Sequence, residues 1–170
     1  MPCNVDRKNI LVGIGDFYID SNPVGGTFDG AEIEKTTDYF DKEVDQVLDA
    51  VDSVPTKVTL IVRTSLAEAT LAHLKDVWNE KLAVQEAGGV RTLFVGIGDV
   101  TQEHQISLTG AGVNGALRTY TFFRARFNGS SAHSVKKDDK ILYPCEFRIL
   151  PDCTKDLGKQ YGTISEPIIP

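Results

Sequence analysis

The chain has 170 residues, of which 41% are hydrophobic and 25% are charged; this composition is typical of a folded domain and excludes a disordered chain. We therefore expect a single domain over residues 1–170. The formal net charge of −6 argues against a basic nucleic-acid-binding surface.

The sequence predicts neither export nor membrane insertion. The first nine residues lack the basic start and the apolar core of a signal peptide, and no apolar run approaches the roughly 20 residues that span a membrane. Cys3, Cys145 and Cys153 match no zinc or redox spacing, so we expect free thiols. We expect a soluble protein made in the cytosol.

A strand and a glycine-rich loop are predicted near the amino terminus. Residues 9–19 place alternate apolar side chains on one face. Residues 21–30 (SNPVGGTFDG) have turn chemistry, because Pro23 fixes one backbone dihedral and Gly25 and Gly26 permit positive φ.

A hairpin is predicted next. Residues 31–35 and 39–51 lie on either side of a candidate turn at residues 36–38, which predicts a hairpin with a long second arm. Residues 55–56 (Pro-Thr) are expected to end that arm. Residues 57–63 are rich in β-branched side chains and predict a further strand.

One α-helix is predicted, at about residues 65–80. Ser65 with Glu68 three residues later forms a capping box, in which each side chain satisfies a backbone N–H group that the first turn leaves unpaired. Apolar residues then recur at helical spacing, at Ala67, Leu71, Leu74 and Trp78. We expect this stripe to lie across a sheet and to close its core.

The rest of the chain predicts strands again. They are expected at residues 90–98, 103–110, 117–127 and 140–150, followed by an extended tail at about 151–170. The strand at 117–127 mixes three arginines with aromatic residues, a pattern that single-stranded nucleic acid can also use. Because the net charge is negative, we expect these arginines to pair with acidic residues, within or between subunits.

The acidic stretch from Asp38 to Pro55 is the main candidate for function. As a strand, it has a mainly acidic face, with Asp41, Glu43, Asp45 and Asp49. The other face of that strand is mainly apolar, with Phe40, Val44 and Leu48. As a helix, it matches the 3.6-residue period better, through Phe40, Val44, Val47, Leu48 and Val51. Periodicity leaves both alternatives open, and in both the carboxylates gather on the solvated side.

The sequence predicts neither a metal site nor an enzyme. A calcium or magnesium loop needs a sharp, usually glycine-centred turn, and no glycine lies between Asp38 and Pro55. The motif GIGD occurs at residues 13–16 and 96–99, but neither copy continues as a dinucleotide-binding turn. No catalytic serine, cysteine or histidine signature is present. We expect no cofactor.

The order of segments from Gly25 to Asn79 resembles the major tail tube proteins of long-tailed bacteriophages. The resemblance lies in a glycine turn, an acidic hairpin arm containing EVDQ, the sequence VPTK leading into a strand, and TSLAEATL. A second patch comprises RTYTFFRARF, YPCEFRILPD and KQYGTI. Together these segments cover most of the chain.

The resemblance implies a mainly β fold: an antiparallel β-sandwich or barrel flanked by one α-helix, with an extended loop and a C-terminal tail. It selects the strand for the acidic stretch. It also implies hexameric rings whose hairpins join into one barrel around a lumen, and stacked rings that form a tube for the genome. Joining edge strands between subunits would remove exposed edges.

The resemblance also implies a non-enzymatic virion protein, located in the tail and assembled in the host cytoplasm. Its partners would be further copies of itself, other tail proteins (terminator, baseplate or tip, tape measure, and sheath in contractile tails) and DNA that passes without specific binding. No membrane insertion is implied. An acidic lumen would repel phosphates and let DNA slide.

Residue roles follow from the resemblance. The lumen is expected to be lined by Asp41, Glu43, Asp45 and Asp49. The core beneath the helix is expected to contain Phe40, Val44, Leu48, Leu71, Leu74 and Trp78. The loop expected to reach the next ring contains Asn22, Pro23, Gly25 and Gly26. The alternative functions are a monomeric β-sandwich binding module and, less favoured, a metal-dependent hydrolase.

Overall fold

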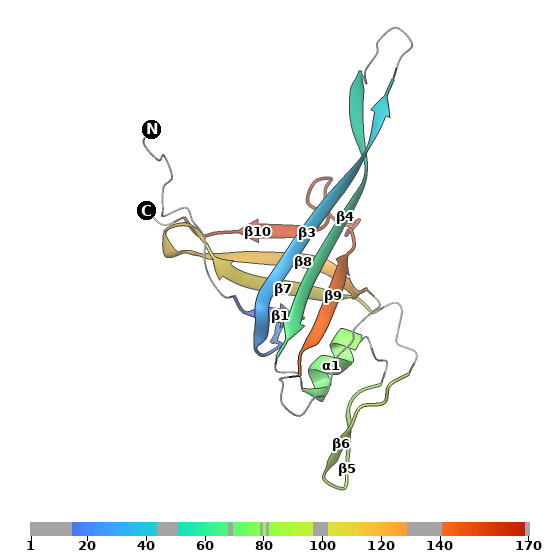
Figure 1. Ribbon diagram of the computed structural model, residues 1–170, viewed down its shortest axis with the longest axis vertical. Coiled ribbons are helices and arrows are strands. Elements are labelled where there is room, and N and C mark those ends of the chain that lie inside the picture. The colour runs from blue at the N-terminus through green and yellow to red at the C-terminus, as the bar shows by residue number, and fades with distance from the viewer. Residues whose placement is uncertain are drawn as a thin grey trace.

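The computed structural model of the protein describes residues 15–43, 51–67, 70–78, 80, 82–96, 102–128 and 141–168. These residues form a mainly β fold with one α-helix, as the sequence predicted (Figure 1). The elements are β1 (Phe17–Ile19), β2 (Asn22–Pro23), β3 (Thr27–Lys42), β4 (Asp52–Leu66), α1 (Leu71–Trp78), β5 (Gln85–Ala87), β6 (Val90–Thr92), β7 (His104–Ala111), a 3₁₀ helix (Val113–Gly115), β8 (Leu117–Phe127), β9 (Tyr143–Ile149) and β10 (Gly162–Ser165).

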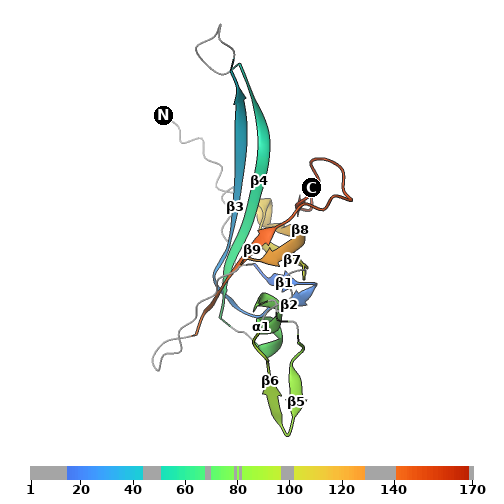
Figure 2. The same ribbon diagram turned by 90° about the vertical axis from the view of Figure 1, so that its right-hand side faces the viewer.

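One antiparallel sheet of eight strands folds over on itself into two layers. Its order is β2-β1-β7-β8-β9-β4-β3, and β10 pairs with β8 beside this path. One edge of β8 pairs with β7, whereas the other pairs first with β10, through residues 119–122, and then with β9, through residues 125–127. Strands β3, β4 and β9 consequently cross over β7, β8 and β10 (Figures 1 and 2).

A bulge in β8 makes the corner between the two layers. His104 of β7 pairs with Ala125 and Ile106 pairs with Phe122, so β8 has one extra residue there. The extra residue shifts the alternation of side chains, and both Phe122 and Ala125 are buried. The Leu150 N–H donates to the Arg124 carbonyl at 2.7 Å at the same corner.

The core lies between the two layers. Val62 and Leu66 of β4, Ile106 of β7 and Phe147 of β9 are completely buried. The rings of Phe17 and Phe147 lie 6.1 Å apart between centroids and join the layers. Burying each such side chain stabilises the fold by about 1.5–3 kcal/mol.

Helix α1 is shorter than predicted, and its predicted cap is wrong. Ser65 lies in β4, where it pairs with Pro144 of β9, and Glu68 lies outside the described residues. The helix is instead capped by Thr70, whose side-chain oxygen accepts from the His73 N–H at 3.3 Å. Pairing with β9 extends β4 through Ser65, so the capping-box pattern does not start the helix.

The helix covers one end of the sandwich. Leu74 and Val77 are buried, and Trp78 is half-buried against the core. Leu71 is half-buried as well. Sequence analysis placed Leu71, Leu74 and Trp78 on this face but missed Val77, which is completely buried.

Strands β3 and β4 form one long hairpin that extends beyond the sandwich (Figures 1 and 2). The predicted turn at residues 36–38 is wrong, because these residues continue β3 and pair with residues 57–59. The predicted break at residues 55–56 is wrong too. Thr56 forms a bulge between the pairs Asp38–Lys57 and Tyr39–Pro55. Pro55 lies next to this bulge, where proline is tolerated. The Thr56 hydroxyl donates to the Asp38 carbonyl at 3.2 Å.

The C-terminal tail contributes a strand to the eight-stranded sheet. Residues 162–165 form β10 and pair with residues 119–122 of β8. The sequence predicted only an extended tail at about residues 151–170, and this part of it pairs with the sheet of its own chain. The predicted bounds of β8 agree with the structure, while β6 and β9 are shorter than predicted.

Candidate functional site

The outer part of the β3–β4 hairpin is the candidate site. We call residues 39–43 and 51–55 the arm. Strand β9 pairs with β4 only from Leu60 to Leu66, and the arm extends beyond the sandwich (Figures 1 and 2), so no described strand lies beside it or covers it. Every arm residue is exposed, and Tyr39 and Phe40 each have 62% of their surface accessible.

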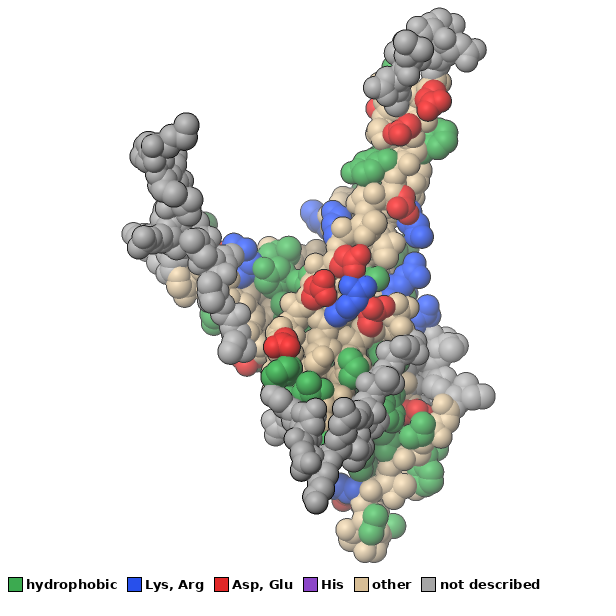
Figure 3. Space-filling view, viewed as in Figure 1, with side chains coloured by type: hydrophobic (Ala, Val, Ile, Leu, Met, Phe, Trp, Pro, Cys, Tyr) green, Lys and Arg blue, Asp and Glu red, His purple; other side chains and the backbone are tan. Residues whose placement is uncertain are grey.

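Apolar side chains lie on both faces of the arm. Directly opposed residues of antiparallel strands share a face, and the register pairs Phe40 with Val54 and Tyr39 with Pro55. Hydrophobic and acidic side chains both reach the surface along the arm (Figure 3). The arm therefore offers two exposed apolar pairs, one on each face.

The polar side chains of the arm interact with one another across the two strands. Lys42 and Asp52 form an ion pair at 3.1 Å, and the Ser53 hydroxyl donates to Asp41 at 2.7 Å. Glu43 is exposed. In total, the arm has three carboxylates and one lysine, so it is acidic.

The structure corrects one predicted core residue and leaves others untested. Phe40 was expected beneath the helix, but it faces solvent, because it lies on the arm beyond the sandwich and on the face of β3 opposite Ile33 and Lys35. Asp41 shares its face with Tyr39 and Pro55, so the described arm has no purely acidic face. The remaining predicted residues, Val44, Asp45, Leu48 and Asp49, lie outside the described residues.

A signal for the exposed aromatic residues was present in the sequence. Successive residues of a strand point to opposite faces, so Tyr39 and Phe40 cannot both enter one core. Sequence analysis placed Phe40 inside and assigned no role to Tyr39.

Below the arm, ion pairs join the three strands of the same layer. The Arg63 guanidinium binds Glu34 of β3 and Glu146 of β9, the latter at 2.7 Å. The two carboxylates raise the pKa of Arg63. Hydrogen bonds from Asn128 and Arg63 hold the pKa of Glu146 below its usual value. These contacts fix the base from which the arm extends.

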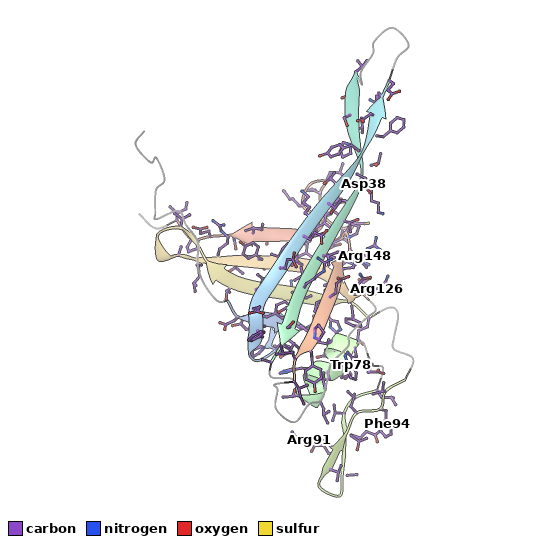
Figure 4. All side chains as sticks on the ribbon, viewed as in Figure 1. Asp38, Trp78, Arg91, Phe94, Arg126 and Arg148 are labelled. Carbon is purple, nitrogen blue, oxygen red and sulfur yellow. The ribbon has the colours of Figure 1, made fainter. Side chains whose placement is uncertain are left out.

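Arg118 and Arg124 of β8 each form an ion pair with a carboxylate of the same chain. Arg118 binds Glu166 in the tail, with 2.6 Å between Nη2 and Oε2, and Arg124 binds Glu103. Arg126 lies opposite Arg148 of β9, and both side chains are on one flank of the sandwich (Figure 4). Pairing within the chain, one of the two expected kinds, accounts for Arg118 and Arg124.

The predicted inter-ring loop is anchored on the sandwich. Asn22, Pro23, Gly25 and Gly26 are exposed, but Val24 between them is 1% exposed and belongs to the core. The Asp20 carboxylate accepts from the Gln105 N–H at 2.8 Å and contacts the His104 ring. The loop thus presents a small polar surface on a fixed base.

A second hairpin, β5–β6, projects at the opposite end of the molecule (Figures 1 and 2). Gly88 and Gly89 form its turn with φ of +60° and +77°, values that glycine adopts without strain. Both strands are exposed, and Phe94 follows them with 47% of its surface accessible. Sequence analysis missed this hairpin, although two glycines between short extended segments are a known hairpin signal.

The described residues contain no group of three or more His, Cys, Asp or Glu side chains arranged to hold a metal ion. Cys145 and Cys153 are free thiols, and burial raises the pKa of Cys145 to about 12. None of the described helical segments is both long and apolar enough to cross a lipid bilayer.

Comparison with known proteins identifies no relative: no protein-family model matches the chain, and no curated protein matches it.

Proposed function

We propose that the protein is a structural subunit whose copies assemble through the arm into hexameric rings, and that these rings stack into the tail tube of a bacteriophage. One observation carries the proposal: the arm is a long hairpin with exposed aromatic residues on both faces, and no described residue of its own chain covers it. The resemblance of the sequence to tail tube proteins supplies the kind of assembly.

The arm has the properties of an assembly element. An isolated two-stranded hairpin is only marginally stable in water, and contiguous exposed apolar surface marks interaction sites. Tyr39, Phe40 and Val51 are each about 60% exposed. A neighbouring subunit would order the arm and remove this apolar surface from water, so association would be favoured by the hydrophobic effect.

Strand β3 adds a second reason to expect association. It is the terminal strand of the sheet order and is 16 residues long. One row of its backbone N–H and C=O groups therefore has no partner strand among the described residues. Proteins usually shorten or cover such an edge, since it pairs readily with other chains. A ring of subunits would cover it in a controlled way.

The two ends of the molecule differ, and this favours head-to-tail contacts. The arm lies at one end of the long axis and β5–β6 at the other (Figure 1). Contacts between unlike surfaces close into rings or continue as filaments, depending on the rotation. We assign the arm to contacts within a ring and the exposed residues Asn22, Pro23, Gly25 and Gly26 to contacts between rings.

In this assembly the acidic residues Asp41, Glu43, Asp45 and Asp49 would line the lumen. Proteins bind DNA non-specifically through lysine and arginine side chains that neutralise its phosphates, whereas carboxylates repel the phosphates. The lumen would pass DNA without binding it. The subunit would act without catalysis or a cofactor, in the virion tail, beside the tail proteins that begin and end the tube.

Electron microscopy of the purified protein over a range of concentrations tests the proposal. We expect rings and tubes from the natural chain, and single subunits from Phe40→Asp. Leu117→Asp is the matched control, because Leu117 is also exposed, at 64%, but lies at the start of β8. It should assemble normally. A natural chain that stays monomeric at every concentration would contradict the proposal and favour a binding module.

A further inference from the structure

The two layers of the sandwich are closed at the β8–β9 corner but open on the other side. There, β3 ends one layer and β10 lies at the border of the other, and no described pairing joins them. The space between them is a cleft of about 460 Å³. We call it the β3–β10 cleft, and it is lined by Ile33, Lys35, Val58, Leu60, Tyr120, Phe122, Gly158, Tyr161, Gly162, Thr163 and Ile164.

The walls of the β3–β10 cleft are mostly apolar. Ile33 and Leu60 come from the β3–β4 wall, and Phe122 comes from the β8 wall. Ile164 of β10 keeps 66% of its surface accessible at the rim. An apolar cleft of this size between two strand edges leaves core-like surface in water, which costs free energy unless another group fills it.

The charge of the cleft is positive. Lys35 is the one lysine, arginine or carboxylate among the lining residues. It pairs in register with Leu60, whose side chain enters the core, and therefore lies on the cleft face of β3. It forms no ion pair with a described residue. An occupant that fits must bring apolar side chains together with carboxylates.

The arm has this composition. On one face of the arm Phe40 and Val54 form an exposed apolar pair next to Asp52, and the arm as a whole has more carboxylates than lysines. It cannot enter the cleft of its own chain, since Ile33 and Lys35 of the wall belong to the same continuous strand. Residue 40 lies roughly 17 Å beyond Lys35 at about 3.3 Å per residue.

We propose that the β3–β10 cleft receives the arm of a second copy of this chain, with Phe40 and Val54 of one face in the cleft and Asp52 of the same face near Lys35. The inference rests on the proposed function for the arm as the assembly element, but adds where the arm binds. Each copy would offer one arm and one cleft, so the contact would be head-to-tail. It would also cover the free edges of β3 and β10.

Chemical crosslinking between two singly substituted chains tests this contact. Both chains carry Cys3→Ser and Cys153→Ser, while Cys145 stays because it is buried. One chain adds Phe40→Cys and the other Ile164→Cys, and a short bismaleimide is applied to the mixture. We expect a crosslinked pair that neither chain gives alone. A control mixture with Leu117→Cys in place of Ile164→Cys should give at least tenfold less product.

The outcomes separate this inference from the proposed function. Rings or tubes without the 40–164 crosslink would overturn the cleft as the binding site and leave the tube intact. The crosslink in open chains or dimers without tubes would support the cleft while contradicting the tube. A chain that never associates would overturn both.

A charge change supplies an independent measurement. Lys35→Glu should raise the protein concentration needed for assembly about tenfold, because it sets a carboxylate against the acidic arm. Lys57→Glu is the matched control: Lys57 pairs with Asp38 on the opposite face of the hairpin, so its change should have a much smaller effect. Equal effects of the two changes would overturn the role of Lys35.

Discussion

Arg124 and Glu103 form a bidentate ion pair at the corner between the layers. The Arg124 Nε lies 2.6 Å from one carboxylate oxygen, and Nη2 lies 2.9 Å from the other. The remaining Nη1 donates to the Pro151 carbonyl at 2.8 Å. One side chain thus connects β8, the segment before β7 and the start of the tail. Two parallel hydrogen bonds fix orientation better than a single contact.

These ion pairs predict that the protein loses stability in acid. The pKa of Glu103 is lowered by its hydrogen bonds from Arg124, and that of Glu166 by those from Arg118. Groups with a lowered folded-state pKa stabilise the protein above their unfolded value, near 4.5 for glutamate, and this stabilisation disappears as the pH falls through the folded value. Urea unfolding should therefore show constant stability from pH 7 to 5 and a decline below about pH 4.5.

Glu103→Gln should make that decline less steep, because one of the responsible carboxylates is gone. The comparison is Glu32→Gln, which removes an exposed carboxylate that forms no ion pair with a described residue. Identical pH profiles for the two variants would show that the Arg124 pair does not contribute.

The start of the helix gives a second prediction. Thr70→Ala removes the side-chain oxygen that accepts from the His73 N–H, and loss of such a cap costs about 0.5–1 kcal/mol. Ser65→Ala should cost less, since Ser65 lies within β4 rather than at the cap. Both values follow from urea unfolding. If Ser65→Ala were the more destabilising change, the cap predicted from the sequence would be the correct one.

Local patterns predicted the strands better than the turns. The bounds of β8 were correct because its alternating aromatic and β-branched residues agree with its place between partner strands. The turn at residues 36–38 was wrong because threonine and aspartate suit turns, yet fourteen residue pairs with β4 hold β3 extended. The capping box at Ser65 failed for the same reason: strand pairing outweighed a local signal worth about 1 kcal/mol.

The candidate sites depend on contacts that no short pattern encodes. Ile33 and Ile164 line one cleft although 131 positions separate them. Strand alternation indicates that one of Tyr39 and Phe40 is exposed, but the distance that the β3–β4 hairpin extends beyond β9 depends on pairing between distant strands. Acidity was predictable, since composition alone gives it. The position of the carboxylates relative to a partner was available only through the resemblance.

Charge reversal on the arm gives a third prediction, which rests on the proposed tube. Asp41→Lys with Glu43→Lys should slow genome ejection severalfold, because lysines in the lumen would bind phosphates that carboxylates repel. Asp41→Asn with Glu43→Gln should lie between this variant and the natural chain. Both residues are exposed, so folding should be unchanged. The measurement is the rate of DNA release from assembled particles.

A control for net charge completes this test. Glu86→Lys changes an exposed carboxylate on β5, away from the arm, and should leave the ejection rate unchanged. If the arm variant assembles and releases DNA at the natural rate, the carboxylates of the arm do not face the lumen.

The loop at residues 21–26 gives the last prediction, on stacking between rings. Deleting residues 21–26 would not separate folding from stacking, because Val24 is buried and the Gly26 carbonyl accepts from the Ala67 N–H at 2.8 Å. Substituting the exposed residues Asn22 and Pro23 is a sharper test. The double change Asn22→Lys with Pro23→Asp alters the surface and keeps the buried Val24 in place. We expect folded subunits and rings, seen by electron microscopy as single rings or short stacks rather than long tubes. Thr92→Asp on β6, which is also exposed, is the comparison at the opposite end. Loss of tubes with Thr92→Asp but not with the loop variant would assign the stacking contact to the β5–β6 hairpin instead of the loop at residues 21–26.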